Sequence, residues 1–506
     1  MTNLNDIISQ FSSENQQKFI SYLEKKNKRN DTKNIELFNL LLKDDLNSKD
    51  VCARLYGKQK KDAYHALRKR LYQSLIDFTA NQSLQEEKAI DMQIIKYILA
   101  SRTFLHHKQY KVAYKILDRA EALAEDNYLF PLLNEIYHTK IQYAYANPSI
   151  NVNTLIEKFK INQKNYHIED QLNIVYAKIR EAINNMNFNS EFIDFQTLVN
   201  KTLEEFDIDI KESMSFKSLY QLMKIVSISA FASNDYLKIE PFLLNTYEVL
   251  LSHRNKEKQQ YYHLQVLYII AYTLFRNKKF KKSLELLEKM NNVIALKKNK
   301  YHNTFKLKYN LILGLNLNFL NNQNEAIKIL EPFLISKHPD IESLLDIYLS
   351  LVMIYFQKGD FQKASKIFSK FYHTDKWYIE RVGKEWVIKK NLIEILLHIE
   401  LNNIDLVESR LLSFKRNYYK FLLEIKQQRV ITYLNLINEY YKAPEMITSI
   451  KFKNKVEDSF EWVGGAQEDI FVISFYSWLK SKMNNTDLYQ TTLTLIKQAQ
   501  QEVKTR

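Results

Sequence analysis

Histidine, cysteine and carboxylate side chains most often carry catalysis or bind metals, and in this 506-residue chain they form no recognisable chemical pattern. The eleven histidines show no His-Glu-x-x-His spacing. The adjacent His106 and His107 would point to different sides of a helix, so they cannot share a metal ion as a local pair. Cys52 is the single cysteine, which excludes an internal disulfide framework and any metal site built from several cysteines. We therefore expect no catalytic residues, no metal site and no cofactor.

The glycines are too few and too scattered for phosphate or nucleotide chemistry. They stand at positions 57, 314, 359, 383, 464 and 465. A phosphate loop, a dinucleotide-binding fingerprint and a nucleophile elbow each need glycines at close, fixed spacing. For this reason an enzyme is not expected.

Positive charge gathers in two places within a net charge of +15. Residues 54–70 contain seven basic residues and one acidic residue, and residues 276–308 contain eleven basic residues and two acidic ones. Such clusters suit nucleic acid or an acidic protein partner. The alternative interpretation is a solvated helix face in a lysine-rich chain.

The first cluster lies in residues 48–75, where the sequence predicts a short helix, a glycine and a long basic helix. Ala53 precedes Gly57 by four residues, and the segment resembles a helix-turn-helix. The resemblance implies that two helices cross tightly at the alanine and that the second helix presents basic side chains to DNA phosphates and base edges. Its packed face is Tyr64, Leu67, Leu71, Leu75 and Phe78. The candidate DNA-binding residues are Lys60, Lys61, His65, Arg68 and Lys69. The alternative is a basic connecting helix that packs the N-terminal unit against the rest of the chain.

These side chains must be positioned by helices, because the composition disfavours most other elements. Six glycines and six prolines in 506 residues lie far below the usual shares of about 7% and 5%. Tight turns between strands need residues with positive φ, so long helices with polar connections are expected. The predicted fold class is all-α.

Residues 351–371 show a helix-pair pattern most clearly. Val352 is a small residue on the first helix, Gly359 breaks the helix, and Phe361 and Ala364 begin the second helix. This pattern resembles the tetratricopeptide repeat (TPR), in which small residues let the two helices of a pair approach closely. The resemblance implies a stack of helix pairs.

The pattern recurs along the chain. Residues at the position of Ala364 are spaced 44, 43, 38 and 43 apart and are Ile239, Ser283, Ala326, Ala364 and Val407. Most units lack the glycine of the family pattern, and Glu394 falls where an apolar residue is expected. Helix pairs near residues 132–166 and 169–206 would fill the gap before Ile239. We predict a TPR-like α-solenoid of about eight helix pairs.

Three segments are expected in the chain. Residues 1–88 form a small N-terminal helical unit with the helix-turn-helix-like pattern, residues 89–425 form the TPR-like array, and residues 426–506 form C-terminal capping helices. The last segment is expected to cover the apolar end of the array. Trp462 and Trp478 within it are expected to be core residues.

The concave surface of the stacked first helices binds peptides or partner helices in the resembled family. Carried over by register, the candidate groove residues are Arg102, His106, Tyr268, Tyr272, Phe275, Arg276, Lys308, Phe319, Met353 and Phe356. Aromatic rings beside arginine and lysine suit an acidic protein or peptide with apolar anchors. Alternatively, adjacent superhelical turns or a homodimer partner bury these rings.

The N-terminus lacks the basic start and apolar core of a signal peptide. The longest apolar run, residues 266–275, is far shorter than the roughly 20 residues of a membrane helix. We expect a cytoplasmic, bacterial protein with no membrane partner that acts as a non-catalytic protein- or peptide-binding scaffold. The alternative is a regulator whose N-terminal unit binds DNA while the array senses a partner or peptide.

Overall fold

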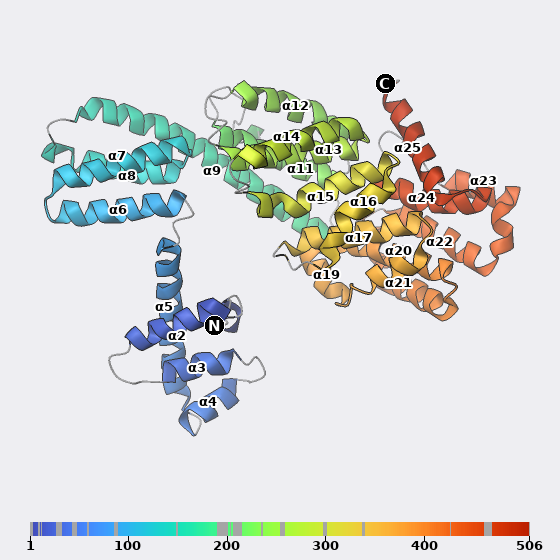
Figure 1. Cartoon of the computed structure of the whole chain (residues 1–506), viewed down its shortest axis with the longest axis horizontal. Helices are drawn as coiled ribbons and strands as arrows, with labels where there is room; N and C mark the ends of the chain where they lie inside the picture. The colour runs from blue at the N-terminus through green and yellow to red at the C-terminus, as the bar shows by residue number, and fades with distance from the viewer. Residues whose placement is uncertain are drawn as a thin grey trace. The chain divides into compact units, whose positions relative to one another are not determined.

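The chain is helical in a computed structural model (Figure 1). The structure describes residues 4–504 apart from 9–10, 12, 27–32, 43–47, 58–59, 86–89, 148–149, 190–200, 203, 206–214, 234–235, 253–258, 297–300, 336–337, 339, 426 and 460–467. These residues form α-helices and short 3-10 helices with no strand among them, which confirms the predicted all-α class. Each helix in the described part is too short or too polar to cross a membrane.

The helices are distributed over two compact units, Met1–Gln163 and Lys164–Arg506. The boundary between the units falls inside one long helix, α9 (Val152–Asn189). The predicted segment boundaries after residues 88 and 425 lie within unit 1 and unit 2, respectively.

Unit 1 begins with a cluster of short helices packed against one long helix. The helices are α1 (Leu4–Ile8), α2 (Ser13–Lys26), α3 (Lys33–Leu41), α4 (Ser48–Tyr56) and α5 (Lys61–Gln85). Aromatic rings form the centre of their core, since the ring of Phe19 lies 4.9 Å from that of Phe38 and 5.2 Å from that of Phe78. The predicted packed face of α5 is confirmed, because all five of its residues are buried in this core: Tyr64, Leu67, Leu71, Leu75 and Phe78.

The turn between α4 and α5 depends on Gly57, whose φ is +67°. Its N–H donates to the carbonyl oxygen of Ala53 at 2.8 Å, and glycine adopts this left-handed conformation without the steric cost of a Cβ. Ala53 itself is exposed, whereas Val51, Cys52 and Leu55 are buried in the core. The expectation that the helices cross at Ala53 is therefore wrong, because α4 turns its neighbouring residues inward instead.

The rest of unit 1 is built from α6 (Ile90–His106), α7 (Tyr110–Asp126), α8 (Phe130–Gln142), the 3-10 turn Ala144–Ala146 and the first part of α9. Helix α7 packs against both α6 and α8, and Ala113 of α7 is fully buried. The predicted break between helix pairs at residues 166–169 is wrong, since α9 runs through it without interruption. Part of the second predicted pair lies outside the described residues.

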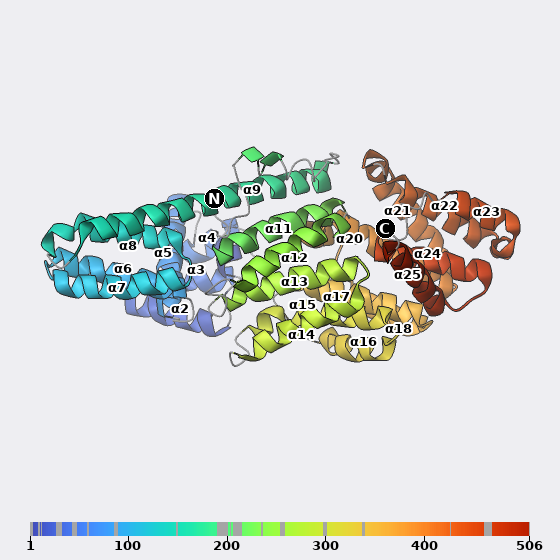
Figure 2. The ribbon, with the colours of Figure 1, turned by 90° about the horizontal axis from the view of Figure 1, so that it is seen from above.

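Unit 2 continues with helices that pack in consecutive pairs (Figure 2). The helices are α11 (Phe216–Ser233), α12 (Tyr236–Ser252), α13 (Gln260–Arg276), α14 (Phe280–Leu296), α15 (His302–Phe319), α16 (Gln323–Leu330), the 3-10 turn Glu331–Ile335, α17 (Ile341–Gln357), α18 (Phe361–Phe368), α19 (Asp375–Val382), α20 (Lys384–Glu400) and α21 (Ile404–Glu424). Helices α13, α15, α17 and α20 each pack on the next helix of their pair, and successive first helices also contact one another.

The two helices of each pair come close at one recurring position. The residues at the predicted close-contact position are all buried: Ile239, Ser283, Ala326, Ala364 and Val407. On α15, a Cβ added to Gly314 would lie only 2.7 Å from Cδ1 of Leu330. The contact between α15 and its partner therefore requires glycine at this position.

One turn conformation recurs between the two helices of a pair. A residue with a φ of 55° to 78° follows the first helix, and the next residue donates its N–H to the carbonyl oxygen five positions back at 2.8 to 3.0 Å. The residues with positive φ are Lys108, Lys278, Asn321, Gly359 and Asn402. Lysine and asparagine adopt this left-handed conformation at a steric cost. The same turn is thus formed by lysine or asparagine in the pairs that lack the glycine of the sequence pattern, at this steric cost.

The chain ends with α22 (Gln428–Lys442), the 3-10 turn Pro444–Thr448, α23 (Ile450–Ser459), α24 (Ile470–Asn484) and α25 (Leu488–Lys504). Helices α24 and α25 pack against each other. Trp478 of α24 is a core residue as predicted, and Trp462 lies outside the described residues.

Candidate functional site

The predicted groove residues of unit 2 are largely covered. Arg276 and four apolar members are buried: Phe275, Phe319, Met353 and Phe356. The half-buried members are Tyr268, Tyr272 and Lys308. Three of the buried rings stand at the C-terminal ends of α13, α15 and α17. Phe275 and Phe319 pack against Phe280 of α14, and Phe356 packs against Phe361 of α18.

Helices α24 and α25 cover these helix ends. The Tyr489 hydroxyl donates to the carbonyl oxygen of Asn318 at 2.6 Å, and Nε1 of Trp478 donates to Oε1 of Glu400 at 2.6 Å. Nε2 of Gln500 donates to the carbonyl oxygen of Lys278 at 2.6 Å. The C-terminal helices thus contact α15, α20 and the turn after α13, rather than only the last helix pair of the array.

An ion pair between Arg276 and Asp469 lies at the centre of this contact. Asp469 also caps α24, because its Oδ1 accepts the N–H of Phe471 at 2.7 Å. Burial would raise the pKa of Asp469, but the positive charges of Arg276 and Lys389 outweigh burial and hold this pKa below its usual range. Asp469 is therefore a charged carboxylate inside unit 2.

Glu468 forms a second pair beside the first. Its carboxylate accepts from Nη2 of Arg429 at 2.8 Å, and its backbone carbonyl oxygen accepts from Nζ of Lys278 at 2.7 Å. Nε of Arg429 is buried and has no hydrogen-bond partner among the described residues. Two successive acidic residues thus hold the start of α24 on α13, on the turn after α13 and on α22.

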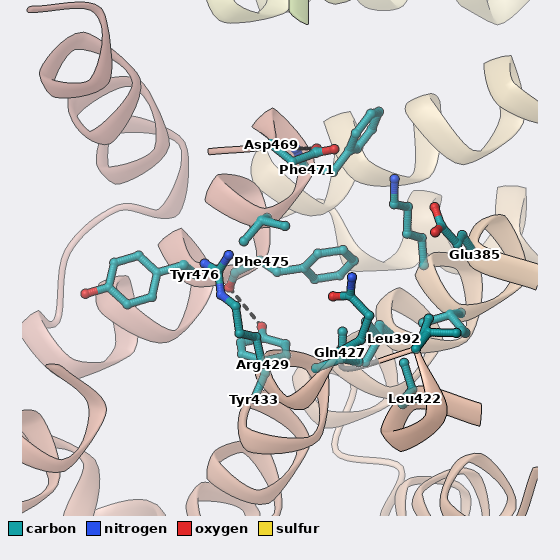
Figure 3. A pocket seen from close by; sticks show the side chains of 15 residues that line it. Glu385, Leu392, Leu422, Gln427, Arg429, Tyr433, Asp469, Phe471, Phe475 and Tyr476 are labelled. Carbon is teal, nitrogen blue, oxygen red and sulfur yellow. Dashed lines mark hydrogen bonds between the residues drawn. The ribbon is translucent and has the colours of Figure 1, made fainter. Parts of the chain in front are cut away.

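A cavity of about 150 Å³ lies beside these pairs, between α20, α22 and α24 (Figure 3). Most of its lining is apolar and includes Leu392 of α20, Val430 of α22, and Val472 and Phe475 of α24. The hydroxyl of Tyr433 donates to the carbonyl oxygen of Phe475 at 2.8 Å and joins α22 to α24 at the cavity wall. The site is an apolar pocket beside a charged cluster.

Polar side chains complete the lining of this cavity. They are Glu385, Lys389, Gln427, Arg429 and Asp469. Nζ of Lys389 lies 4.9 Å from the centroid of the Phe471 ring, a cation–π arrangement. The cavity can therefore hold an apolar group and offer hydrogen bonds to polar atoms attached to it.

Asp346 of α17 is a carboxyl group that packs against α20. Its Oδ1 accepts from Nε1 of Trp386 at 2.8 Å. Burial raises the pKa of Asp346 to about 6, although Trp386 and Lys389 both oppose the shift. The charge of this residue therefore changes close to neutral pH.

A second cavity, of about 280 Å³, is polar and lies around α20 and α21. Oε1 of Glu394 accepts from Nε of Arg410 at 2.9 Å, and its other carboxylate oxygen is 4.0 Å from Nζ of Lys390. Glu394 departs from the apolar pattern of the repeat because it is paired with charges on its own and the next helix.

The remaining predicted groove residues, Arg102 and His106, are exposed on α6 in unit 1. Arg102 pairs with Glu135 of α8. They belong to a different unit from the eight other predicted groove residues.

Helix α5 of unit 1 carries the predicted DNA-binding residues on and near its first turns. Four of them are exposed: Lys60, Lys61, His65 and Lys69. Arg68 is half-buried and donates from Nη1 to the Tyr64 hydroxyl at 3.2 Å. The exposed residues 61, 65 and 69 follow one another at helical spacing on a single flank.

The acidic residues Glu468 and Asp469, and Arg429, the partner of Glu468, were not among the residues predicted from the sequence. Asp469 stands directly before the apolar run that begins at Ile470, and an acidic residue in that place is a recognisable helix N-cap signal. Arg429 carries no such signal, because its partner Glu468 is 39 residues away and meets it only in the folded chain.

Comparisons with known proteins leave the family open: the chain matches no protein-family model, no curated protein and no solved structure. In the described part of the chain, no three histidine, cysteine or acidic residues gather in a group that could hold a metal ion.

Proposed function

We propose that this chain is a non-catalytic scaffold, built as a TPR-like α-solenoid, that binds a peptide or a segment of a partner protein. The observation that carries the proposal is the apolar cavity between α20, α22 and α24, with Arg429 and Lys389 in its lining. Pockets that recognise peptides combine an apolar recess with a few fixed polar groups. The close helix pairs and their recurring turn support the repeat architecture.

The proposal shifts the binding surface away from the rings at the ends of the first helices. Phe275, Phe319 and Phe356 are buried within unit 2, so a partner would have to displace folded helices to reach them. The cavity needs no such displacement, because the fold already provides its walls. A partner is therefore expected to bind beside α24.

Selection from a random peptide display library against the full-length chain tests the function. We expect enriched peptides that share an apolar residue and compete with one another for the chain. Lys328→Ser serves as the control, because Lys328 is exposed on α16 and stands more than 50 residues before the first residue of the cavity lining. Failure to enrich any peptide family over an unrelated helical protein would reject the proposal.

A second candidate function, DNA binding by unit 1, is favoured by one observation. Lys61, His65 and Lys69 are exposed on one flank of α5, while the opposite residues of this helix are buried in the core. Such a row of basic side chains suits contact with DNA phosphates. Regulation would then combine this contact with partner binding in unit 2.

Fluorescence anisotropy with duplex DNA tests this second candidate. Lys61→Glu with Lys69→Glu should weaken binding and reduce the slope of log affinity against log salt by about 2. Lys25→Glu with Lys111→Glu changes the net charge equally at exposed positions of the same unit and is the matched control. Equal losses in both double variants would indicate attraction by net charge alone and would reject a DNA-binding face on α5.

A further inference from the structure

We infer that the cavity between α20, α22 and α24 takes one phenyl or branched aliphatic side chain of the bound peptide, and that Arg429 donates a hydrogen bond to a carbonyl oxygen beside that side chain. This inference rests on the proposed function and specifies its ligand.

The size and lining of the cavity define the apolar part of the ligand. Its volume is about 150 Å³, and Leu392, Val472 and Phe475 contribute apolar walls. An apolar recess of about this size can hold a single aromatic ring. One phenylalanine or leucine side chain is therefore the matching occupant.

Arg429 defines the polar part. Its Nη2 already donates to Glu468, while its buried Nε has no partner among the described residues. A ligand oxygen cannot reach this buried Nε, but the Arg429 side chain is 33% exposed, and the other N–H groups of its guanidinium can donate to a ligand oxygen in the cavity. Because Glu468 already balances the charge of Arg429, a neutral carbonyl oxygen suits the position better than a second carboxylate.

The neighbouring acidic residues support the same assignment. Asp469 is paired with Arg276, and Glu468 is paired with Arg429. Both carboxylates are committed to holding α24 in place, so neither is needed to bind a positively charged ligand. An apolar recess with the Arg429 donor beside it is the complement of an apolar residue within a peptide, and Glu385, Lys389 and Gln427 line other parts of the recess.

Three small probes distinguish the contribution of the apolar recess from that of the hydrogen bond. Their binding to the full-length chain is measured by ligand-observed NMR. N-acetylphenylalanine methylamide carries both the ring and the carbonyl groups, toluene carries only the ring, and N-acetylalanine methylamide carries only the carbonyl groups. We expect the phenylalanine probe and toluene to bind. The alanine probe should bind at least about tenfold more weakly than the phenylalanine probe, because its methyl group leaves the cavity empty.

Variants then assign the binding to the cavity. Val472→Phe and Val430→Phe each place a ring in the cavity and should reduce binding of the phenylalanine probe and of toluene by at least about tenfold. Arg429→Lys keeps a charge for Glu468 but lacks the planar fork of N–H groups that can donate to Glu468 and to a ligand at once. This variant should weaken the affinity for the phenylalanine probe about fivefold and leave the affinity for toluene unchanged. Thermal unfolding identifies any variant that does not fold, and the two filling variants are independent of each other.

Unchanged probe binding in both folded filling variants would overturn the cavity assignment, as would absence of toluene binding to the native chain. An equal effect of Arg429→Lys on both probes would overturn the role of Arg429. If library-selected peptides bind equally to the native chain and to Val472→Phe, the inference fails while the proposed function stands. If toluene binds but no peptide is selected, the proposed function fails, and the peptide assignment fails with it.

Discussion

Arg276 and Asp469 are 193 residues apart in the sequence and form a buried ion pair that joins the end of α13 to the start of α24. Asp469 also caps α24 through the N–H of Phe471. One carboxylate therefore starts the last helix pair and fixes it on the array.

Replacing Asp469 with asparagine tests the importance of this pair. Asp469→Asn keeps an oxygen that can cap α24 but leaves the buried guanidinium of Arg276 without a countercharge. We expect a loss of about 3–5 kcal/mol in the free energy of unfolding of unit 2, measured by urea denaturation. Glu439→Gln removes an exposed pair with Lys455 and should cost less than about 1 kcal/mol. Similar losses in the two variants would contradict a central role for the buried pair.

The pKa of Asp346 predicts a pH dependence of stability. Because the folded-state pKa of about 6 lies above the ordinary value of 3.8, the protonated form stabilises the fold. That contribution is complete below about pH 4 and is lost as the pH rises through about 6. Asp346→Asn retains an acceptor for Trp386 and has no carboxyl proton to lose. Between about pH 4 and pH 7.5, the native chain should lose on the order of 2–3 kcal/mol relative to this variant. If the urea unfolding midpoints of the native chain and of the variant change with pH in parallel over this range, the prediction is wrong.

Two lysines in the recurring turn should respond in opposite ways to glycine. Lys108 has a φ of 59° and is exposed, so Lys108→Gly should stabilise unit 1 by about 0.5–1 kcal/mol by relieving steric cost. Lys278 has a φ of 60°, but its buried Nζ donates to the carbonyl oxygen of Glu468. Lys278→Gly should therefore destabilise unit 2 despite the same backbone relief. Thermal unfolding of the two variants measures both effects. A shift of the unfolding temperature in the same direction for both variants would contradict the prediction.

Gly314 is predicted to act through packing. A Cβ at this position would meet Leu330 at 2.7 Å, and Leu330 is fully buried and cannot move aside freely. Gly314→Ala should cost about 1–3 kcal/mol of unfolding free energy. In a double-mutant cycle with Leu330→Ala, the second substitution should cost less in the Gly314→Ala background than in the native chain. Additive costs would mean that the two residues do not crowd each other.

Local features of the fold were predictable from the sequence, because periodicity and residue size act over a few residues. The buried face of α5 and the close-contact positions such as Ala326 and Ala364 belong to this class. The unbroken α9 was not predictable, since a weak break in the apolar pattern does not end a helix without a capping or breaking residue.

The candidate site depended on long-range contacts and was largely missed. Arg276 was expected to face a partner, but Asp469 from the far end of the sequence pairs with it. Phe275 and Phe319 were expected in an open groove, and helix-scale periodicity does not reveal which distant segment will cover an apolar surface. The cavity is likewise formed by α20, α21, α22 and α24, whose lining residues are distant in sequence and come together only in the folded unit.

The contacts of α24 and α25 also have a consequence for biosynthesis. A ribosome releases α13, α15 and α17 long before it has made residues 468–504, so the surface that α24 and α25 pack against stays uncovered while synthesis continues. Exposed apolar surface of this kind is prone to aggregation. Completion of unit 2 is therefore a late event in translation, and transcripts truncated near their 3′ end should yield chains that depend on chaperones.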